Sequence, residues 1–170
     1  MGKKATSRKT LEQEKLSLRR EVERLSGEGR HADAIVLLKR LAEMSPRNPL
    51  IWNDLGVEYA AMGDLDEAIA ALRQGRAVYT PAFAPILSNL GKFLLQRFLQ
   101  DSNAISDTGA GSESLSEAIR LLNASLDRDP ENLEAHALLA VAQERAGRKD
   151  IAAAHLRIVE SMSGSGVSFE

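Results

Sequence analysis

The strongest constraint on this fold is a short pattern that recurs at regular intervals. An alanine followed four positions later by a leucine begins at positions 34, 68, 118 and 152, so the successive offsets are 34, 50 and 34. The two residues of each pair lie about one helical turn apart, so they share one face of a helix. A repeat unit of 34 residues indicates helix pairs that stack in an array. The four pairs are Ala34 and Leu38, Ala68 and Leu72, Ala118 and Leu122, and Ala152 and Leu156.

Other residues keep the same phase. The offset from Gly29 to Gly63 is 34, and the offset from Gly63 to Gly147 is 84, which equals one long and one short interval. The larger offset also relates Pro46 to Pro130 and Asn48 to Asn132. We therefore predict four repeats, at about 15–48, 49–82, 83–132 and 133–166.

The second repeat carries the most specific motif. Its spacing is W-x2-L-G-x2-Y, from Trp52 to Tyr59, followed by Ala68. The three large residues share one helical face, and Gly56 leaves room for a neighbouring helix. The motif closely resembles the tetratricopeptide repeat, a 34-residue helix–turn–helix unit. The other repeats are degenerate: Leu18, Leu87 and His136 replace the tryptophan, and Leu25, Leu94 and Gln143 replace the tyrosine.

The resemblance covers about nine-tenths of the chain and implies an all-α fold. In this family the helix pairs stack into a right-handed superhelical solenoid. We expect one domain over residues 10–162, preceded by a disordered basic tail at 1–9 and followed by a flexible tail at 163–170. The aromatic fraction of 4% also favours close-packed helices over a sheet.

Helix boundaries are predicted from local signals. The first helix should begin at Thr10 and end between Gly27 and Gly29. Asn48 suits an N-cap, and Pro49 suits the first turn of the next helix. A variant capping box, Asp64-x-x-Glu67, should start the second helix of the second repeat.

The third repeat contains an insertion of about 15 residues. The offset from Gly56 to Ala68 is 12, whereas the offset between their counterparts, Gly91 and Ala118, is 27. We expect the first helix to lengthen through Phe98 and Leu99, a mobile loop over 101–111, and a capping box, Ser114-x-x-Glu117, at the start of the next helix.

Composition narrows the function classes. The chain has no cysteine, which excludes disulfides and thiol catalysis. It has no apolar run long enough to span a membrane and no secretory signal, so we predict a cytoplasmic protein. Residues 1–30 carry a net charge of +4 and residues 31–170 carry −6. A basic arm of this kind could contact nucleic acid, although a solvated tail is the simpler interpretation.

No catalytic or cofactor motif is present. The three histidines, at 31, 136 and 155, have no second metal ligand at helical spacing. The glycines at 109 and 111 lack the strand and the lysine that a phosphate-binding loop needs, so we interpret that segment as a linker. We predict a protein that is not an enzyme and has no cofactor or metal.

The resemblance implies a binding surface, because the first helix of each repeat lines the concave face in this family. By position, the predicted ligand-binding residues are Asn53, Val57, Ser88, Asn89, Lys92 and Gln96. The same positional transfer adds Arg19, Glu23, Ala60, Ala61, Leu95, Glu134, Ala137, Val141 and Arg145. Amide and hydroxyl side chains suit a peptide backbone, which both donates and accepts hydrogen bonds.

Chaperone-binding members grip a C-terminal carboxylate with a cationic cluster. Counted from the first repeat, the equivalent positions hold Arg19, Glu23, Asp54, Pro85 and Asn89. Counted from the second, they hold Asn53, Val57, Asn89, Glu134 and Leu138. Neither set supplies the cluster, so we do not expect a carboxylate clamp.

The sequence therefore predicts a non-catalytic scaffold that binds a peptide or helix of a partner protein in a concave groove. One alternative is a structural subunit of a larger assembly or a homo-oligomer, which would associate through its end helices. Another is nucleic-acid contact through the basic N-terminal arm. The identity of the partner is beyond what the sequence specifies.

Overall fold

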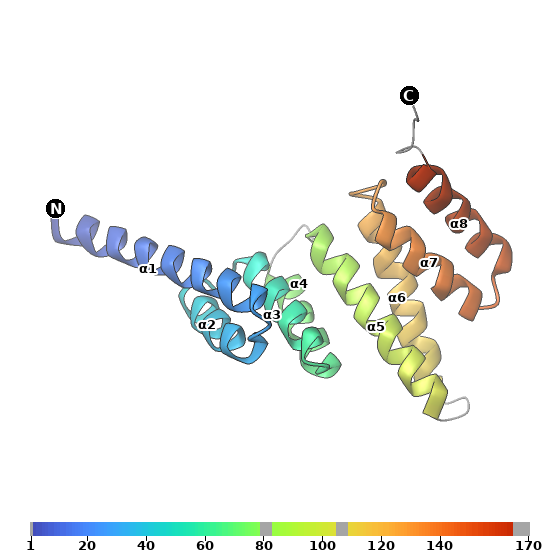
Figure 1. Cartoon of the computed structure of the whole chain (residues 1–170), viewed down its shortest axis with the longest axis horizontal. Helices are drawn as coiled ribbons and strands as arrows, with labels where there is room; N and C mark the ends of the chain where they lie inside the picture. The colour runs from blue at the N-terminus through green and yellow to red at the C-terminus, as the bar shows by residue number, and fades with distance from the viewer. Residues whose placement is uncertain (1, 79–82, 105–108, 165–170) are drawn as a thin grey trace. The chain divides into compact units, whose positions relative to one another are not determined.

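The computed structural model describes the backbone of residues 2–78, 83–104 and 109–164, and no described residue lies in a strand. The described part contains eight helices (Figure 1). This confirms the predicted all-α fold. The helices are α1 Gly2–Gly27, α2 His31–Met44, α3 Pro49–Ala61, α4 Leu65–Val78, α5 Ala84–Ala104, α6 Gly109–Leu126, α7 Leu133–Arg145 and α8 Lys149–Gly164.

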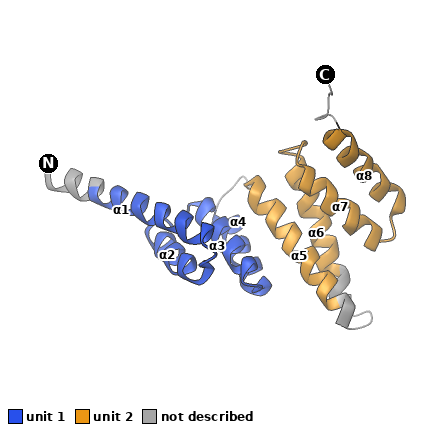
Figure 2. Cartoon of the chain, viewed as in Figure 1, with its two compact units in different colours: residues 1–81 blue, residues 82–170 orange. Residues whose placement is uncertain are grey.

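The helices form two compact units, Met1–Pro81 and Ala82–Glu170 (Figure 2). Each unit contains two helix pairs, so the division falls at the expected junction between the second and third repeats. The repeat pattern predicts one domain over 10–162, because it continues across this junction. Sequence periodicity records which residues can pack, and it does not report how many packed bodies result.

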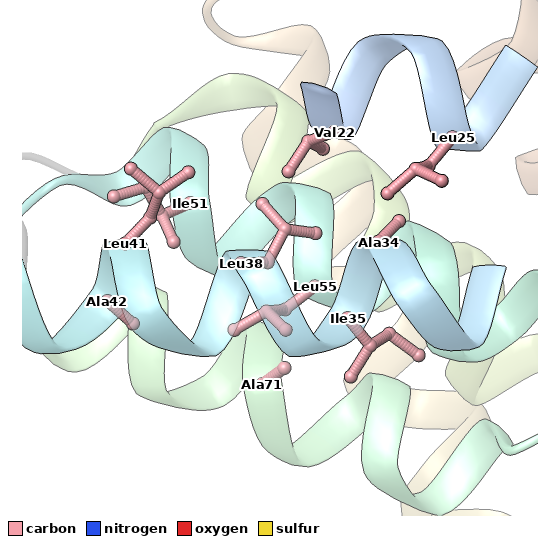
Figure 3. Packing of buried hydrophobic residues seen from close by; sticks show 10 residues of the cluster. All are labelled: Val22, Leu25, Ala34, Ile35, Leu38, Leu41, Ala42, Ile51, Leu55 and Ala71. Carbon is pink, nitrogen blue, oxygen red and sulfur yellow. The ribbon is translucent and has the colours of Figure 1, made fainter. Parts of the chain in front are cut away.

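Unit 1 is built on successive helix contacts. Helix α1 packs on α2, α3 packs on α4, and α2 also packs on α3, which joins the two pairs. Its core contains aliphatic side chains from these helices (Figure 3). The core residues of unit 1 are Val22, Leu25, Ala34, Ile35, Leu38, Leu41, Ala42, Ile51, Leu55 and Ala71.

Unit 2 is also built on successive helix contacts. In this unit, α5 packs on α6 and α7 packs on α8, while α7 also contacts both α5 and α6.

The recurring alanine–leucine pairs lie at the helix contacts, as the spacing predicted. Three of the four pairs are completely or almost completely buried, and the exception is Leu156 on α8. A Cβ atom added to Gly56 would lie 2.6 Å from Leu72 Cγ, and one added to Gly91 would lie 2.7 Å from Leu122 Cγ. The two glycines therefore allow the helices of their pairs to approach closely.

The turns inside three of the helix pairs share one geometry. Gly29, Gly63 and Gly147 adopt positive φ angles of 71°, 87° and 76°. The amide of the next residue bonds back to the carbonyl five residues earlier, as in Asp64 N to Tyr59 O at 2.9 Å. This is a Schellman motif, and glycine is favoured there because it has no Cβ atom. The regular spacing of these glycines along the sequence is thus explained by a repeated helix stop.

The predicted N-cap after the first repeat is confirmed. The Asn48 side chain accepts a hydrogen bond from Leu50 N at 3.1 Å, and Pro49 begins α3. Its counterpart Asn132 accepts one from Ala135 N at 2.9 Å, at the start of α7. Helix α4 begins at Leu65, directly after Asp64, where the sequence placed its start.

The prediction of a disordered tail at 1–9 is wrong, because α1 is helical from Gly2. The apolar stripe, which begins near Thr10, does not mark the start of this helix. Residues 2–9 contain no proline, and their three lysines, one arginine and one alanine favour helix. A helix already nucleated by its packed part can continue into such a segment.

The predicted loop in the third repeat is also wrong for most of its length. Residues 101–104 belong to α5 and residues 109–111 to α6, while 105–108 lie outside the described residues. Ser114 lies inside α6, so it does not cap its start. Helix α5 has 21 residues and α6 has 18, whereas α3 has 13 and α4 has 14. Packed segments extend these helices through residues that weakly favour turns.

Candidate partner-binding surfaces

The predicted site residues lie on the first helix of their pairs, but in two different units. Asn53 and Val57 are on α3 of unit 1. Ser88, Asn89, Lys92 and Gln96 are on α5 of unit 2. Each unit therefore has its own candidate face, formed by α1 and α3 in unit 1 and by α5 and α7 in unit 2. We call these the α1/α3 face and the α5/α7 face.

An ion pair crosses the α1/α3 face. Arg19 Nη2 lies 3.2 Å from Asp54 Oδ2, and both side chains are about one-third exposed. Burial raises the pKa of Asp54, while the Arg19 charge and a hydrogen bond from Asn53 act in the opposite direction. The ion pair thus links α1 to α3. It also engages Arg19, the cation that positional transfer placed on this face. Val57, by contrast, is 41% exposed.

A second ion pair crosses the α5/α7 face. Lys92 Nζ lies 2.6 Å from Glu134 Oε1. Gln96 is exposed and Asn89 is half-buried, so both can reach solvent. Ser88 is buried, and this contradicts its predicted role as a groove residue. Leu95 is buried as well, because this side of α5 faces the core of unit 2.

The two faces share one apolar feature. Val57 on α3 and Val141 on α7 are related by the same offset of 84 as the paired glycines, so they hold the same repeat position. Val141 is 40% exposed, nearly the same as Val57. An apolar side chain thus remains open to solvent at the same place in each unit. The ion pair of each face lies on the same first helices as its valine.

Unit 1 also contains a groove on the side formed by its second helices. The groove has a volume of about 620 Å³ and runs between α2 and α4, with α3 as its floor. Trp52 and Tyr59 are half-buried in this floor. Trp52 Nε1 donates a hydrogen bond to Pro46 O at 2.8 Å, and Lys39 Nζ lies 5.6 Å from the centre of the Tyr59 ring. The sequence motif identified these aromatics as core residues and gave no sign of the groove.

Two histidines lie at the equivalent positions of unit 2. His136 replaces Trp52, and its Nε2 lies 3.0 Å from Pro130 O, which can only accept a hydrogen bond. Its Nδ1 lies 2.9 Å from Nδ1 of His155 on α8. In neutral His136 with Nε2 protonated, Nδ1 is the acceptor, so His155 donates. The sequence gave no reason to connect the two histidines, since they belong to separate predicted helices.

A buried carboxylate joins three helices of unit 1. Glu58 on α3 accepts a hydrogen bond from Ser26 Oγ at 2.6 Å, and its other oxygen lies 2.7 Å from His31 Nδ1. Only 9% of the Glu58 side chain is exposed. This cluster satisfies a carboxylate that would otherwise be costly to bury, so its role is structural.

The described residues contain neither a metal cluster nor a membrane-spanning helix. Over this part of the chain, no group of three or more histidine, cysteine, aspartate or glutamate side chains could hold a metal ion. None of the described helices has the length and hydropathy that crossing a membrane would require.

Comparisons with known proteins agree with this architecture. Tetratricopeptide repeat models match residues 25–90 and 110–164. No curated protein matches the sequence significantly. One similar solved structure is a MamA protein, with 17% identity and a TM-score of 0.71, over 92% of this chain and 79% of that one. Another is TTC0263, a thermophilic TPR protein of Thermus thermophilus, with 20% identity and a TM-score of 0.70, over 87% and 74%.

A third similar structure is the first TPR of Spaghetti (RPAP3) bound to the HSP90 peptide SRMEEVD. Its identity is 17% and its TM-score 0.64, over 79% of this chain and 94% of that one. Identities this low establish the fold alone. The two family matches, the repeated glycine turns and the buried alanine–leucine pairs together show that this chain belongs to the tetratricopeptide repeat family, whose repeats generally mediate protein–protein interaction.

Proposed function

We propose that this protein is a non-catalytic interaction module that binds a peptide segment or helix of a partner protein on its first-helix faces. The proposed contact residues are Asn53 and Val57 on the α1/α3 face. On the α5/α7 face they are Asn89, Gln96 and Val141. Lys92 contributes there through its aliphatic stem, because its charged end is held by Glu134.

The observation that carries the proposal is the pair of equivalent exposed valines. Core positions of the repeat are buried in both units, yet this position is about 40% exposed in both. An apolar side chain bordered by amides and charged groups matches the composition of a protein interface, with an apolar centre and a polar rim. The amides of Asn53, Asn89 and Gln96 can bond to a peptide backbone.

The cations of these faces favour a peptide without an acidic end. Arg19 is engaged by Asp54, and Lys92 by Glu134. A peptide carboxylate would have to displace these acidic side chains. The RPAP3 structure holds the peptide SRMEEVD, but the paired cations here argue against a carboxylate clamp on either first-helix face.

The test replaces the exposed valines with a charged residue. Val57→Glu combined with Val141→Glu should abolish capture of the partner from native cell extract, detected by quantitative mass spectrometry. Val36→Glu is the matched control, because Val36 is 66% exposed on the second helix α2. The control should retain capture, and all variants should keep the wild-type helical circular dichroism.

The amide contacts can be tested separately with the identified partner segment. Asn53→Ala combined with Asn89→Ala should weaken binding in calorimetry without lowering the melting temperature. Unchanged affinity in both the valine and the asparagine double variants would place the binding surface elsewhere and refute the proposal.

A second candidate function is self-association through α8, or its use as a contact in a larger assembly. Three large apolar side chains of this helix, Ile151, Leu156 and Ile158, are exposed. Mass measured by light scattering should then rise with concentration, and Ile158→Glu should abolish the rise while Val36→Glu should not. A constant monomer mass across the concentration range would eliminate self-association.

A further inference from the structure

A pocket of unit 2 is lined by residues of α5 and α6 and by the end of α7 with the turn that follows it. Its volume is about 410 Å³, which is within the usual range for sites that hold one large side chain or a small ligand. One wall is apolar and is formed by Phe98 of α5 and by Leu115 and Ile119 of α6. The opposite wall is the turn between α7 and α8, with Arg145, Ala146 and Arg148. Ser116 adds a hydroxyl group.

The insertion in the third repeat adds the aromatic ring of the apolar wall, whereas Leu115 and Ile119 hold the repeat positions of Leu65 and Ile69. Phe98 holds the position equivalent to Gly63, by the same offset that relates Gly91 to Gly56. At Gly63 the first helix of the second repeat has already ended in its turn, whereas α5 continues as a helix through Phe98 to Ala104. Helices α5 and α6 thus extend beyond the turn between α7 and α8 (Figure 1). Without the added residues, no ring would stand opposite this turn.

The second wall is cationic, and its two arginines form no ion pair with a described side chain. Among the residues whose side chains are described, no carboxylate lies within ion-pair distance of Arg145 or Arg148. Arg148 donates one hydrogen bond to the neutral Gln143 Oε1 at 3.3 Å. Arg19 and Lys92 on the first-helix faces are neutralised by Asp54 and Glu134, whereas Arg145, the last residue of α7, is not. Two guanidinium groups can each bind a carboxylate through two hydrogen bonds.

We propose that this pocket binds an acidic peptide segment of a partner protein, in which a large apolar side chain is adjacent to one or two carboxylates. The apolar side chain lies against Phe98, Leu115 and Ile119, and the carboxylates bind Arg145 and Arg148. A long polyanion such as a nucleic acid does not fit, because residues 31–170 carry a net charge of −6 and would repel it beyond the pocket. The pocket lining does not include the exposed valines, although Val141 lies one helical turn before Arg145, and the inference does not rest on the proposed function.

The probe is the peptide Asp-Phe-Leu-Asp with an acetylated amino end and an amidated carboxyl end. Its matched control is Asn-Phe-Leu-Asn, which has the same shape and no charge. In NMR titrations of the whole chain, we expect shifts centred on Phe98, Ser116 and Ala146. The acidic peptide should bind about tenfold more tightly than the neutral one, which corresponds to two charge-assisted contacts at the protein surface.

Variants of exposed residues test the assignment without threatening the fold. Arg145→Gln combined with Arg148→Gln should reduce affinity for the acidic peptide to that of the neutral peptide. Lys149→Gln removes a neighbouring cation that does not line the pocket, so it should leave affinity for this probe nearly unchanged. Equal binding of the two peptides, full affinity in the double arginine variant, or shifts confined to another surface would each overturn the proposal.

Discussion

The two units place different side chains at equivalent positions, and the differences change what each unit can do. Trp52 in unit 1 corresponds to His136 in unit 2, and Ala71 corresponds to His155, since each pair is related by the repeat offset of 84. Both Trp52 and His136 contact the carbonyl of the proline six residues earlier. In unit 1 the small Ala71 leaves a groove of about 620 Å³. In unit 2 His155 reaches across and bonds to His136.

This comparison separates the repeat scaffold from its local content. Buried alanines and glycine turns recur in both units, because the packing of helix pairs requires them. Other features of the described residues differ between the units. The groove lined by Trp52 and the Glu58 cluster were found in unit 1, and the histidine pair was found in unit 2. The groove, the Glu58 cluster and the histidine pair depend on residues that the repeat pattern leaves free to vary. Functional differences between the units should therefore be sought at such positions.

The largest difference in stability is expected at one shared position of the second helices. Leu72 is fully buried, whereas its counterpart Leu156 is 50% exposed. Leu72→Ala should lower the free energy of unfolding by about 2–5 kcal/mol, as a buried leucine truncation does. Leu156→Ala should cost less than about 1.5 kcal/mol, because half of that side chain already contacts water. Denaturant titration of both variants checks the order, and equal losses would contradict the burial difference.

A smaller loss is expected at Glu58, which has no counterpart in unit 2 because Ala142 holds that position. Glu58→Ala leaves Ser26 and His31 without their shared acceptor, so the free energy of unfolding should fall by about 1–3 kcal/mol. Glu160→Ala, at an exposed site on α8, is the control and should change stability by less than about 0.5 kcal/mol. If thermal unfolding shows the same melting temperature for both variants, the cluster does not stabilise unit 1.

The smallest effect is a pH dependence confined to unit 2. Burial lowers the pKa of His155 below its ordinary 6.5, and the neighbouring His136 lowers it further. The unfolded chain then binds this proton more readily than the folded chain. The stability contributed by neutral His155 is therefore present above about pH 6.5 and is lost as the pH falls below that value.

Urea titrations at about pH 7.5 and pH 5.5 can measure this effect. His155→Ala introduces the residue found at Ala71 of unit 1 and should reduce the loss of stability on acidification. It should also open a groove in unit 2 like that of unit 1. An identical pH dependence in the variant would show that another group is responsible.

Much of the fold could be predicted from the sequence because its signals are local. Asn48 with Pro49 specified the start of α3, and Gly29 and Gly63 specified the ends of α1 and α3 within a few residues. The predicted contact of Gly56 with the second helix depended only on helical spacing, and Leu72 Cγ occupies that space. The prediction from sequence was wrong where weak local preferences opposed helix extension, at residues 2–9 and around Ser114.

The candidate site was less predictable. Positional transfer from the family placed Ser88 in the groove, yet the structure buries it. It also treated Val141 as an additional lining residue, although that valine is exposed like Val57. The pattern of a repeat identifies the buried and the exposed side of a helix. The exposure of a side chain near the boundary between these two sides depends on the helices that pack beside it.

The sequence by itself determined the helix pairs, their turns and the family, because helix periodicity, caps and positive-φ glycines act over a few residues and recur with the repeat. The sequence predicted that α5 lengthens through Leu99, and only the tertiary structure decided that α5 continues to Ala104, that α6 begins at Gly109, that the array forms two units, and that His136 meets His155. It also brought Phe98 opposite Arg145 and Arg148. These outcomes join residues from separate helices, and their physical basis is the burial of side chains between packed helices, which no local spacing records.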